Sequence, residues 1–202
     1  MYRDLLKDLD FFKDKSLRFW AHIGPFMKPI RIGATEYIVT EGEYAAEMYF
    51  IRKGRVDIVL REFNNFPFIT VEKGYYFGEV DLLLGETRKF TFRASEETEL
   101  LALSKKDFTK IFIQEFKDIG AEIYHNALRR RVKYLKTQKE AIEYCKVKGF
   151  RQKPSFKSQK TMISKDKFNM RRGSFQNLIH GLKVKNDGSD KKDDLSDEET
   201  PQ

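Results

Sequence analysis

The sequence predicts a mainly β domain with helices (α+β), in which a β-roll or jelly-roll barrel is flanked by N-terminal helices and two C-terminal helices. Three observations support this fold class. Short apolar runs alternate with turn signals over residues 29–103, apolar residues recur at helical spacing on both sides of that region, and apolar periodicity fades from Gly149 onward. We therefore expect an N-terminal helical segment over residues 1–28, a β-roll over 29–103, two helices over 104–147 and a disordered tail over 148–202.

The N-terminal segment carries apolar residues at the spacing of one or two short amphipathic helices. These residues are Leu5, Leu6, Leu9, Phe12, Leu17, Phe19 and Trp20. The charged residues between them are of both signs, and the segment lacks the apolar stretch of a secretory signal peptide. We expect it to pack against the β-roll.

The central region holds six short runs rich in β-branched and aromatic residues. The runs are YIVT (37–40), MYFI (48–51), VDIVL (56–60), FPFITV (66–71), FTFRA (90–94) and LLAL (100–103). Glycine, Lys-Gly, Asn-Asn and Ser-Glu turn signals separate them. Many short strands at near-regular spacing are typical of a β-sandwich or a jelly-roll-like barrel.

Two helices are expected after the last strand. Ser104 followed by Asp107 fits a helix N-cap with an acidic residue at the third helical position. Apolar residues then recur at helical spacing to about Cys145, and the second helix, over about 118–145, is long and rich in basic residues.

The charge of the chain is distributed unevenly. Of the net +8 over 202 residues, residues 149–185 carry +9 and residues 186–202 carry −5, which leaves +4 for residues 1–148. The basic character is therefore mostly a property of the tail, and a solvated tail explains it without a partner. Contact with an anionic membrane is the alternative that we keep, and nucleic acid is not favoured.

Composition also limits the compartment and the class of activity. A single cysteine, Cys145, permits no internal disulfide, and no run of 18 apolar residues is present. His22, His125 and His180 lie far apart in sequence, and no nucleophile or metal-ligand cluster stands out. We expect a cytoplasmic protein that is not an enzyme and holds no metal.

One stretch carries most of the functional information, namely YYFGEVDLLLGETRKFTFRAS at residues 75–95. A short helix would start near Glu79, and the free N–H groups at such an end favour an anion. Arg88 can grip a phosphate with two hydrogen bonds, and the Glu79 carboxylate can accept from a ribose hydroxyl. These residues taken alone fit a ribose-phosphate site and a structural salt bridge equally well.

The segment FGEVDLLLGETRKFTFRA, residues 77–94, resembles the phosphate-binding cassette of cyclic nucleotide-binding domains. EGEYAAEMYFIRKGRVDI at residues 41–58 resembles the strand and hairpin that precede this cassette, and LDFFKDKS and LALSKKDFTKIF resemble the family's flanking helices. Within the family, the single domain and its Met-Tyr-Phe-Ile strand look most like the cytoplasmic C-terminal domain of cyclic nucleotide-gated and voltage-gated cation (potassium) channels.

The resemblance implies a role for each residue that matches the cassette. Glu79 would accept from the ribose 2′-OH and Arg88 would hold the cyclic phosphate, while Gly78 and the backbone amides of the short helix, including that of Val80, would complete the anion cradle. Lys89, directly after the arginine, is a further candidate contact.

The family's last helix closes over the base, and here it would bring Arg130 and Tyr134, four residues apart on one face. A register shift of one residue would instead present Arg129 or Arg131. Ile58 and Ile69 would line the base pocket, or would serve as plain core.

Two positions in the cassette depart from the family pattern. Asp81 stands where the family usually has a small residue, and a carboxylate there repels a bound phosphate unless it turns away. Lys89 stands where the family has Ala or Thr. Because Thr at this position is associated with cGMP preference, its absence favours cAMP as the ligand.

The resemblance predicts a cyclic nucleotide-binding regulatory module, the ligand-sensing part or a relative of a cation channel at the inner face of a membrane. Its partners would be a channel pore domain or other protein subunits. The alternative is a structural or interaction module with the same fold that binds no nucleotide.

A second motif lies in the basic tail. Two arginines, a spacer, a serine and an apolar residue match the consensus that cyclic nucleotide-dependent kinases phosphorylate, and they occur here at Arg171, Arg172, Gly173, Ser174 and Phe175. Phosphorylation of Ser174 would add roughly two negative charges to a basic segment. We expect Ser174 as a candidate phosphorylation site, although short motifs of this kind also arise by chance in basic tails.

Overall fold

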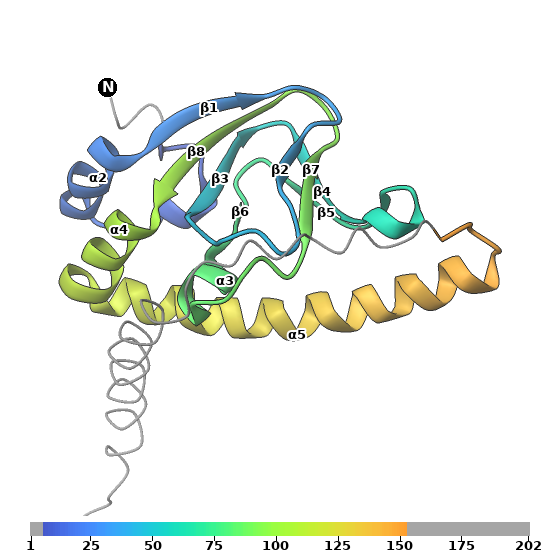
Figure 1. The fold of residues 1–202 in the computed structure, drawn as a ribbon. Coiled ribbons are helices and arrows are strands. Elements are labelled where there is room, and N and C mark those ends of the chain that lie inside the picture. Colours follow the sequence, from blue (N-terminus) through green and yellow to red (C-terminus); the bar gives the residue numbers. More distant parts are fainter. Residues whose placement is uncertain (1–5, 153–202) are drawn as a thin grey trace, which may run out of the picture. The chain divides into compact units, whose positions relative to one another are not determined.

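Two four-stranded antiparallel sheets form the centre of the structure, a computed structural model that describes residues 6–152 (Figure 1). The first sheet has the order β1 (Lys28–Ile32), β8 (Thr98–Ser104), β3 (Glu47–Lys53) and β6 (Tyr76–Phe77). The second has the order β2 (Tyr37–Val39), β7 (Thr91–Ala94), β4 (Arg55–Leu60) and β5 (Phe66–Glu72). The predicted mainly β fold with helices is confirmed, but the strands form two sheets and no closed barrel.

Two strands, β1 and β6, lie outside the six apolar runs of the sequence. β1 is an edge strand of half-exposed and exposed residues, and its Pro29 suits an edge because proline offers no N–H to a neighbouring strand. β6 is only two residues long, so its pairing with Tyr49 and Phe50 of β3 depends on tertiary structure. Short or polar strands of this kind leave little periodic signal in a sequence.

The core between the sheets is apolar and aromatic. Buried residues from both sheets form one cluster, in which Phe77 of β6 stacks on Phe92 of β7 with ring centroids 4.6 Å apart. The cluster also contains Tyr134, which comes from the long C-terminal helix. The core therefore joins the two sheets to that helix.

The N-terminal segment forms the 3-10 helix η1 (Asp10–Phe12), helix α2 (Leu17–Ile23) and the 3-10 helix η2 (Gly24–Phe26). Ser16 caps α2 by accepting a hydrogen bond from the Phe19 amide. Phe11, Phe12 and Phe19 bury their rings against one another and against Phe50 and Phe112. We call these five residues the aromatic cluster.

Helix α4 (Lys105–Phe108) begins at the predicted cap, where the Ser104 hydroxyl accepts from the Asp107 amide at 3.2 Å. It continues as the π-helix η4 (Thr109–Glu115), and helix α5 (Lys117–Val147) follows. The close contact between η4 and α5 requires glycine at position 120, since a Cβ there would lie 1.9 Å from the Phe112 carbonyl oxygen. α5 then passes α3 and the strand β5, and it is in contact with both (Figure 1).

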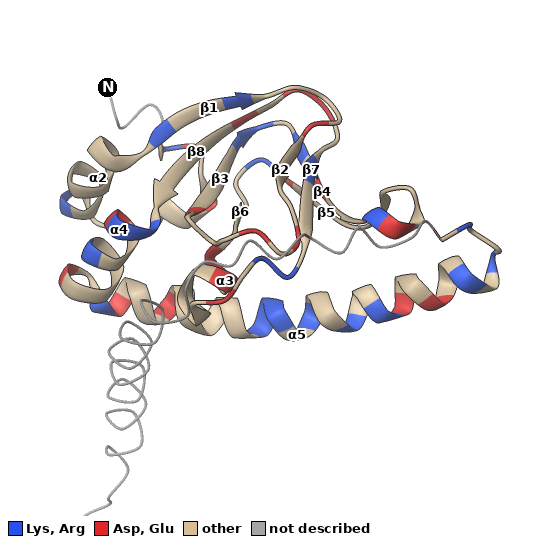
Figure 2. Ribbon diagram, in the orientation of Figure 1, with Lys and Arg blue, Asp and Glu red and all other residues tan. Residues whose placement is uncertain are grey.

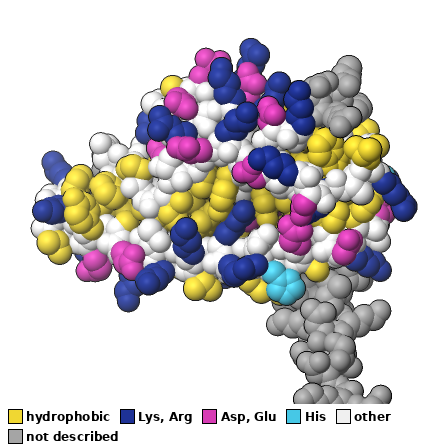
Figure 3. All heavy atoms as spheres, turned by 180° about the vertical axis from the view of Figure 1, so that it is seen from behind, with side chains coloured by type: hydrophobic (Ala, Val, Ile, Leu, Met, Phe, Trp, Pro, Cys, Tyr) yellow, Lys and Arg dark blue, Asp and Glu magenta, His cyan; other side chains and the backbone are white. Residues whose placement is uncertain are grey.

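Charged side chains of both signs are mixed over the surface. Figure 2 shows acidic residues at the short helix α3 (Glu79–Leu84) and basic residues along the middle of α5, which packs against α3. Seen from behind, hydrophobic side chains appear between charged ones (Figure 3). Of the helices within residues 6–152, none combines the length and the apolar character that crossing a membrane requires.

Candidate functional site

The cassette folds around the short helix α3. Gly78 caps its start with φ 86°, in the left-handed region that favours glycine, and a Cβ there would lie 3.0 Å from Arg88 Nη1 and 3.2 Å from the Glu47 carbonyl oxygen. Gly85 ends the helix with φ 64°. Gly78 is the glycine that the sequence resemblance singles out. The two glycines lie at the two ends of α3, and the chain beyond Gly85 brings Arg88 back to the start of the helix, where it contacts Gly78.

Among residues 6–152, Arg88 is the largest fully buried side chain, with 2% of its surface exposed. Its Nη1 donates to the Gly78 carbonyl oxygen at 2.7 Å, and its Nη2 donates to the Glu47 carbonyl oxygen of β3. Burial lowers the pKa of Arg88, while the Asp81 carboxylate opposes that shift. The guanidinium is thus a cation held inside the protein at the start of α3.

Glu79 is the second buried charge of the cassette, with 1% exposed. Its Oε1 accepts a hydrogen bond of 2.8 Å from Arg130 Nη1 on α5. Burial raises the pKa of Glu79, and the charge of Arg130 opposes this rise. The carboxylate predicted to bind a hydroxyl is therefore engaged by the long helix.

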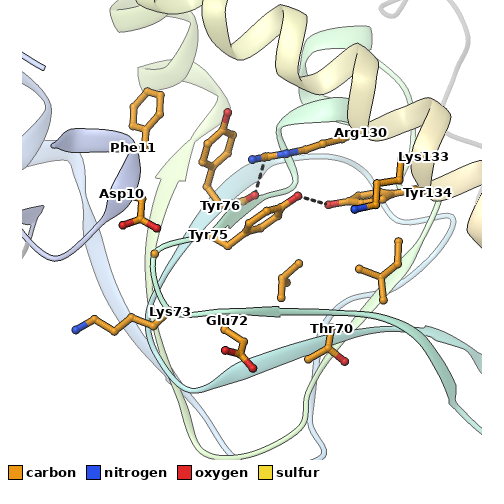
Figure 4. Close-up of a pocket in the computed structure, with 13 residues that line it drawn as sticks. Asp10, Phe11, Thr70, Glu72, Lys73, Tyr75, Tyr76, Arg130, Lys133 and Tyr134 are labelled. Carbon is orange, nitrogen blue, oxygen red and sulfur yellow. Dashed lines mark hydrogen bonds between the residues drawn. The ribbon is translucent and has the colours of Figure 1, made fainter. Parts of the chain in front are cut away.

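Arg130 lies between the cassette and two tyrosines. Its Nη1 also donates to the Tyr76 carbonyl oxygen at 2.9 Å, and its guanidinium lies 4.2 Å and 3.9 Å from the ring centroids of Tyr75 and Tyr76 (Figure 4). Such cation–π contacts stabilise a desolvated cation. Arg129 and Arg131 point elsewhere, to Asn126 and to Glu86. In this structure it is Arg130 that reaches Glu79.

Tyr134 lies one turn beyond Arg130 on α5 and is buried in the core cluster. Its hydroxyl is 3.1 Å from that of Tyr75, and its ring meets Phe90 edge-on. Burial raises the pKa of Tyr134 well above its usual value. Ile58 and Ile69 are cross-strand partners on β4 and β5, and both belong to or pack against the same cluster.

Asp81 and Lys89, the two departures from the family pattern, differ in burial and in the charged residue that each one faces. Asp81 is buried, with Oδ2 3.9 Å from Arg88 Nη1, and burial raises its pKa to about 6 against the lowering effect of Arg88 and of a backbone hydrogen bond from Lys89. The Lys89 ammonium instead lies 3.6 Å from Glu86 and is half-exposed. Its charge is therefore directed to Glu86, and Arg88 is the cation paired with Asp81.

Three further residues contribute to the site that the sequence did not single out. Tyr75 and Tyr76 hold Arg130, and Glu47 contributes its carbonyl oxygen to Arg88. The tyrosine pair directly before Phe77 could have been found as an aromatic signal beside a basic helix. Glu47 could not have been found from the sequence, because it contributes a backbone carbonyl oxygen, which every residue type has.

A cavity of about 390 Å³ lies beside the cassette, between η1, β5, the turn before β6 and α5 (Figure 4). Its lining includes Tyr75, Tyr76, Arg130 and Tyr134, together with Ile69 of β5. The volume is within the usual range for small-molecule sites. Neither Glu79 nor Arg88 lines this cavity, whereas Arg130, which donates a hydrogen bond to Glu79, does.

The candidate phosphorylation site Ser174 and the charged tail lie outside the described residues. They remain predictions from the sequence. The structure gathers the predicted site residues in two groups. Around α3 it brings together Gly78, Glu79, Val80, Arg88 and, from α5, Arg130. In the core cluster it brings together Ile58, Ile69 and Tyr134.

Comparison with known proteins gives a consistent result. A family model described as the cyclic nucleotide-binding domain matches residues 29–115. A cAMP-dependent protein kinase regulatory subunit of Candida albicans is 29% identical over 111 residues, which cover 55% of this chain and 24% of that protein. A cyclic nucleotide-gated potassium channel of Rhizobium etli is 31% identical over 105 residues, covering 52% and 28%. The matched segment thus spans about a quarter of the length of these relatives.

Solved structures show the same fold. The regulatory subunit of a cAMP-independent protein kinase A from Trypanosoma brucei matches with a TM-score of 0.59 and 18% identity, over 68% of this chain and 48% of that one. The structure of PfPKA-R with bound cAMP matches with a TM-score of 0.51 and 25% identity, over 64% and 46%.

Proposed function

Residues 29–115 match the family model of the cyclic nucleotide-binding domain, and from this premise we propose that the chain binds a cyclic nucleotide, cAMP in preference to cGMP, as a regulatory module. The observation that carries the proposal is the pair of buried charges on one cassette. Arg88 and Glu79 both lie at the start of α3. There the Arg88 guanidinium can bind an anion, and the Glu79 carboxylate can accept a hydrogen bond from a hydroxyl group.

In this proposal the cyclic phosphate binds to Arg88 and to the free amides at the start of α3, including that of Val80. The ribose hydroxyl donates to Glu79, which can accept on either of its two oxygens. The base lies toward Ile58, Ile69 and Tyr134, where the apolar wall of the core is continuous with α5. No step of this recognition needs catalysis or a metal, and we propose a non-enzymatic role.

Helix α5 is the element through which binding would be sensed. Arg130 donates to the same carboxylate that the ribose would use, so ligand binding and the Arg130–Glu79 contact depend on each other. A ligand that binds one position of α5 more tightly than another shifts the population of α5 positions. The proposed output is therefore a change at α5, transmitted to whatever part of an assembly α5 contacts.

The preference for cAMP rests on position 89. The family resemblance associates a threonine there with cGMP, and the Lys89 side chain at that position is directed to Glu86. A lysine offers no hydroxyl group to a guanine base at this place.

The assembly that we favour is a cation channel, with this domain on the cytoplasmic side of the membrane. The similarity to a cyclic nucleotide-gated potassium channel supports this assembly. The similarity to a kinase regulatory subunit supports a protein kinase as the alternative partner. The proposal includes protein partners of either kind. It also includes contact of the basic tail with an anionic membrane and phosphorylation of Ser174.

A second function is favoured by one specific observation. Both amino groups of Arg88 donate to backbone carbonyl oxygens, and Glu79 is paired with Arg130, so both charges have internal partners. A domain that uses its charges only to hold itself together would serve as an interaction module. Direct titration separates the two functions.

The test is calorimetric titration of the chain with cAMP and with cGMP. We expect cAMP to bind more tightly than cGMP, and Arg88→Ala to weaken cAMP binding roughly 10- to 100-fold, because a charge-assisted contact to the phosphate is lost. Arg93→Ala is the matched control, since Arg93 is on the next strand and donates to the Thr35 carbonyl oxygen at an exposed position.

Circular dichroism and thermal unfolding of each variant must show a folded protein. If Arg88→Ala unfolds, Glu79→Gln replaces it, because the amide keeps the shape of the side chain and removes its charge. Absence of binding by the wild type at millimolar nucleotide would favour the interaction module.

A further inference from the structure

Asp81 lies beside the arginine that is proposed to hold the phosphate. It is the third residue of α3, its Oδ2 lies 3.9 Å from Arg88 Nη1, and it receives a backbone hydrogen bond from Lys89. An arginine and the backbone amides around a helix start are the groups that bind phosphate. The Asp81 carboxylate is thus an anion of the protein itself, placed at the arginine that is proposed to hold the phosphate.

The hydrogen bonding around this pair is incomplete. Within the described part of the chain, Asp81 Oδ1 and Arg88 Nε are both buried without a hydrogen-bond partner. Buried polar atoms are rarely left unpaired, and each such group costs free energy. The Nε donor would be satisfied by a phosphate oxygen, whereas Oδ1 as a carboxylate oxygen would repel it.

The charges around Asp81 come from several elements. Glu79 and Glu86 of the cassette add negative charge, and Arg130 and Arg131 of α5 pair with them. Glu43 and Tyr49, from the preceding loop and from β3, face Arg88. Lys89 is paired with Glu86. Arg88 therefore remains the cation that faces Asp81, and it cannot neutralise both a carboxylate and a phosphate.

We propose that Asp81 is a built-in competitor for the phosphate site, and that cyclic nucleotide binding is coupled to the uptake of one proton by Asp81. This proposal rests on the proposed function. The proton comes from solvent and converts the carboxylate into a carboxylic acid, and no other bond changes. The acid can then donate its O–H to a phosphate oxygen, so repulsion is replaced by a hydrogen bond.

The sign of the pH dependence follows directly. A phosphodiester stays negatively charged throughout the neutral range, and its approach raises the pKa of Asp81 further above the value of about 6 that burial gives it in this structure. The complex therefore binds more protons than the free protein above about pH 6. Affinity for cAMP is highest at and below that pH and falls, by up to roughly tenfold per pH unit, as the pH rises beyond it.

The experiment is titration calorimetry with cAMP between pH 5.5 and 8.5, in pairs of buffers with different ionisation enthalpies. The dependence of the observed heat on the buffer measures the number of protons taken up. For the wild type we expect uptake approaching one proton per cAMP at pH 7.5. For Asp81→Asn we expect uptake near zero and an affinity that is tighter than that of the wild type at pH 8 and nearly constant with pH.

Two further variants make the result specific. Asp81→Ala introduces a small residue of the kind that the family usually has and should behave like Asp81→Asn, which covers the case in which the amide disturbs folding. Glu86→Gln removes a carboxylate of the same cassette that does not face Arg88, and it should keep the proton uptake of the wild type.

The possible outcomes separate the two proposals. Binding by the wild type without proton uptake, or equal uptake by the wild type and Asp81→Asn, overturns the role of Asp81 and leaves nucleotide binding standing. Loss of uptake in Glu86→Gln to the same extent as in Asp81→Asn also overturns it, because the effect would then be one of general charge. No binding by any of these proteins at any pH overturns the proposed function itself.

Discussion

The aromatic cluster and the cassette are both buried, but they are held together by opposite means. Phe11, Phe12 and Phe19 need only to pack, and their rings lie at ordinary edge-on and stacked distances from their neighbours. In the cassette, Glu79 and Arg88 are also buried, but their charges are stabilised by hydrogen bonds to particular groups. Glu79 accepts from Arg130, and Arg88 donates to the Gly78 carbonyl oxygen.

The difference indicates where stability and function lie in this domain. Burial of an apolar ring is favourable by itself, whereas burial of a charge is costly unless it is paired and hydrogen-bonded. A protein that retains buried charges with unpaired polar atoms accepts a cost that an apolar cassette would avoid. That cost is understandable if the charges serve a ligand.

The largest expected effect is on the apolar side of this comparison. Phe19 is fully buried among other aromatic rings, and Phe19→Ala should lower the free energy of unfolding by about 3–5 kcal/mol, through lost burial and a cavity. Denaturant unfolding measures it. Leu17→Ala is the control on the same helix, because Leu17 is 68% exposed and its loss should change stability by less than about 0.5 kcal/mol.

The next effect tests the charged side. Arg130→Ala leaves Glu79 buried without its partner and should destabilise the protein by about 3 kcal/mol at pH 7. With the arginine gone, the folded-state pKa of Glu79 rises further, so the loss should shrink as the pH falls toward the ordinary glutamate value and both states become protonated.

Arg129→Ala is the control for this experiment, because Arg129 is exposed and donates a hydrogen bond to Asn126, nearby on α5. Adding Glu79→Gln to Arg130→Ala should recover part of the stability at pH 7. If the double variant is no more stable than Arg130→Ala, the cost does not arise from an unpaired Glu79 charge.

A smaller effect concerns Asp81 in the absence of ligand. Its folded-state pKa of about 6 lies above the ordinary aspartate value, so the native state binds more protons than the unfolded state between about pH 4 and pH 6. Wild-type stability should therefore lose up to about 3 kcal/mol from this group as the pH rises through that window. Relative to wild type, Asp81→Asn should gain stability between pH 4.5 and pH 8, measured by unfolding at both pH values. An equal difference at both would contradict a raised pKa.

The smallest effect is expected for the hydroxyl group of Tyr134, in the core cluster beside the cassette. Tyr134→Phe keeps the buried ring and removes the hydrogen bond to the Tyr75 hydroxyl. The expected cost is about 1 kcal/mol, detectable as a small drop in the midpoint of thermal unfolding. Tyr144→Phe, on the same helix and half-exposed, serves as the control and should change nothing measurable.

Much of the fold could be predicted from periodicity and caps. The six apolar runs lie in six of the strands, and the Ser104–Asp107 cap starts α4 as its pattern predicts. The residues of β1 and β6 could not be found in this way, because an edge strand with charged residues and a two-residue strand have too little periodicity. The separation into two sheets depends on pairing between distant strands, which local patterns do not encode.

The sequence by itself determined the chemistry available to the cassette and its resemblance to cyclic nucleotide-binding domains. Gly78, Glu79 and Arg88 stand at fixed spacing and supply a glycine that tolerates a left-handed backbone, a hydrogen-bond acceptor and a cation. Only the tertiary structure decided how these groups are used. It brought Arg130 of α5 onto Glu79, two backbone carbonyl oxygens onto Arg88, and Asp81 beside that arginine. The reason is physical: the charge of a side chain is set by its type, but its partners and its desolvation are set by segments that lie far apart in the chain.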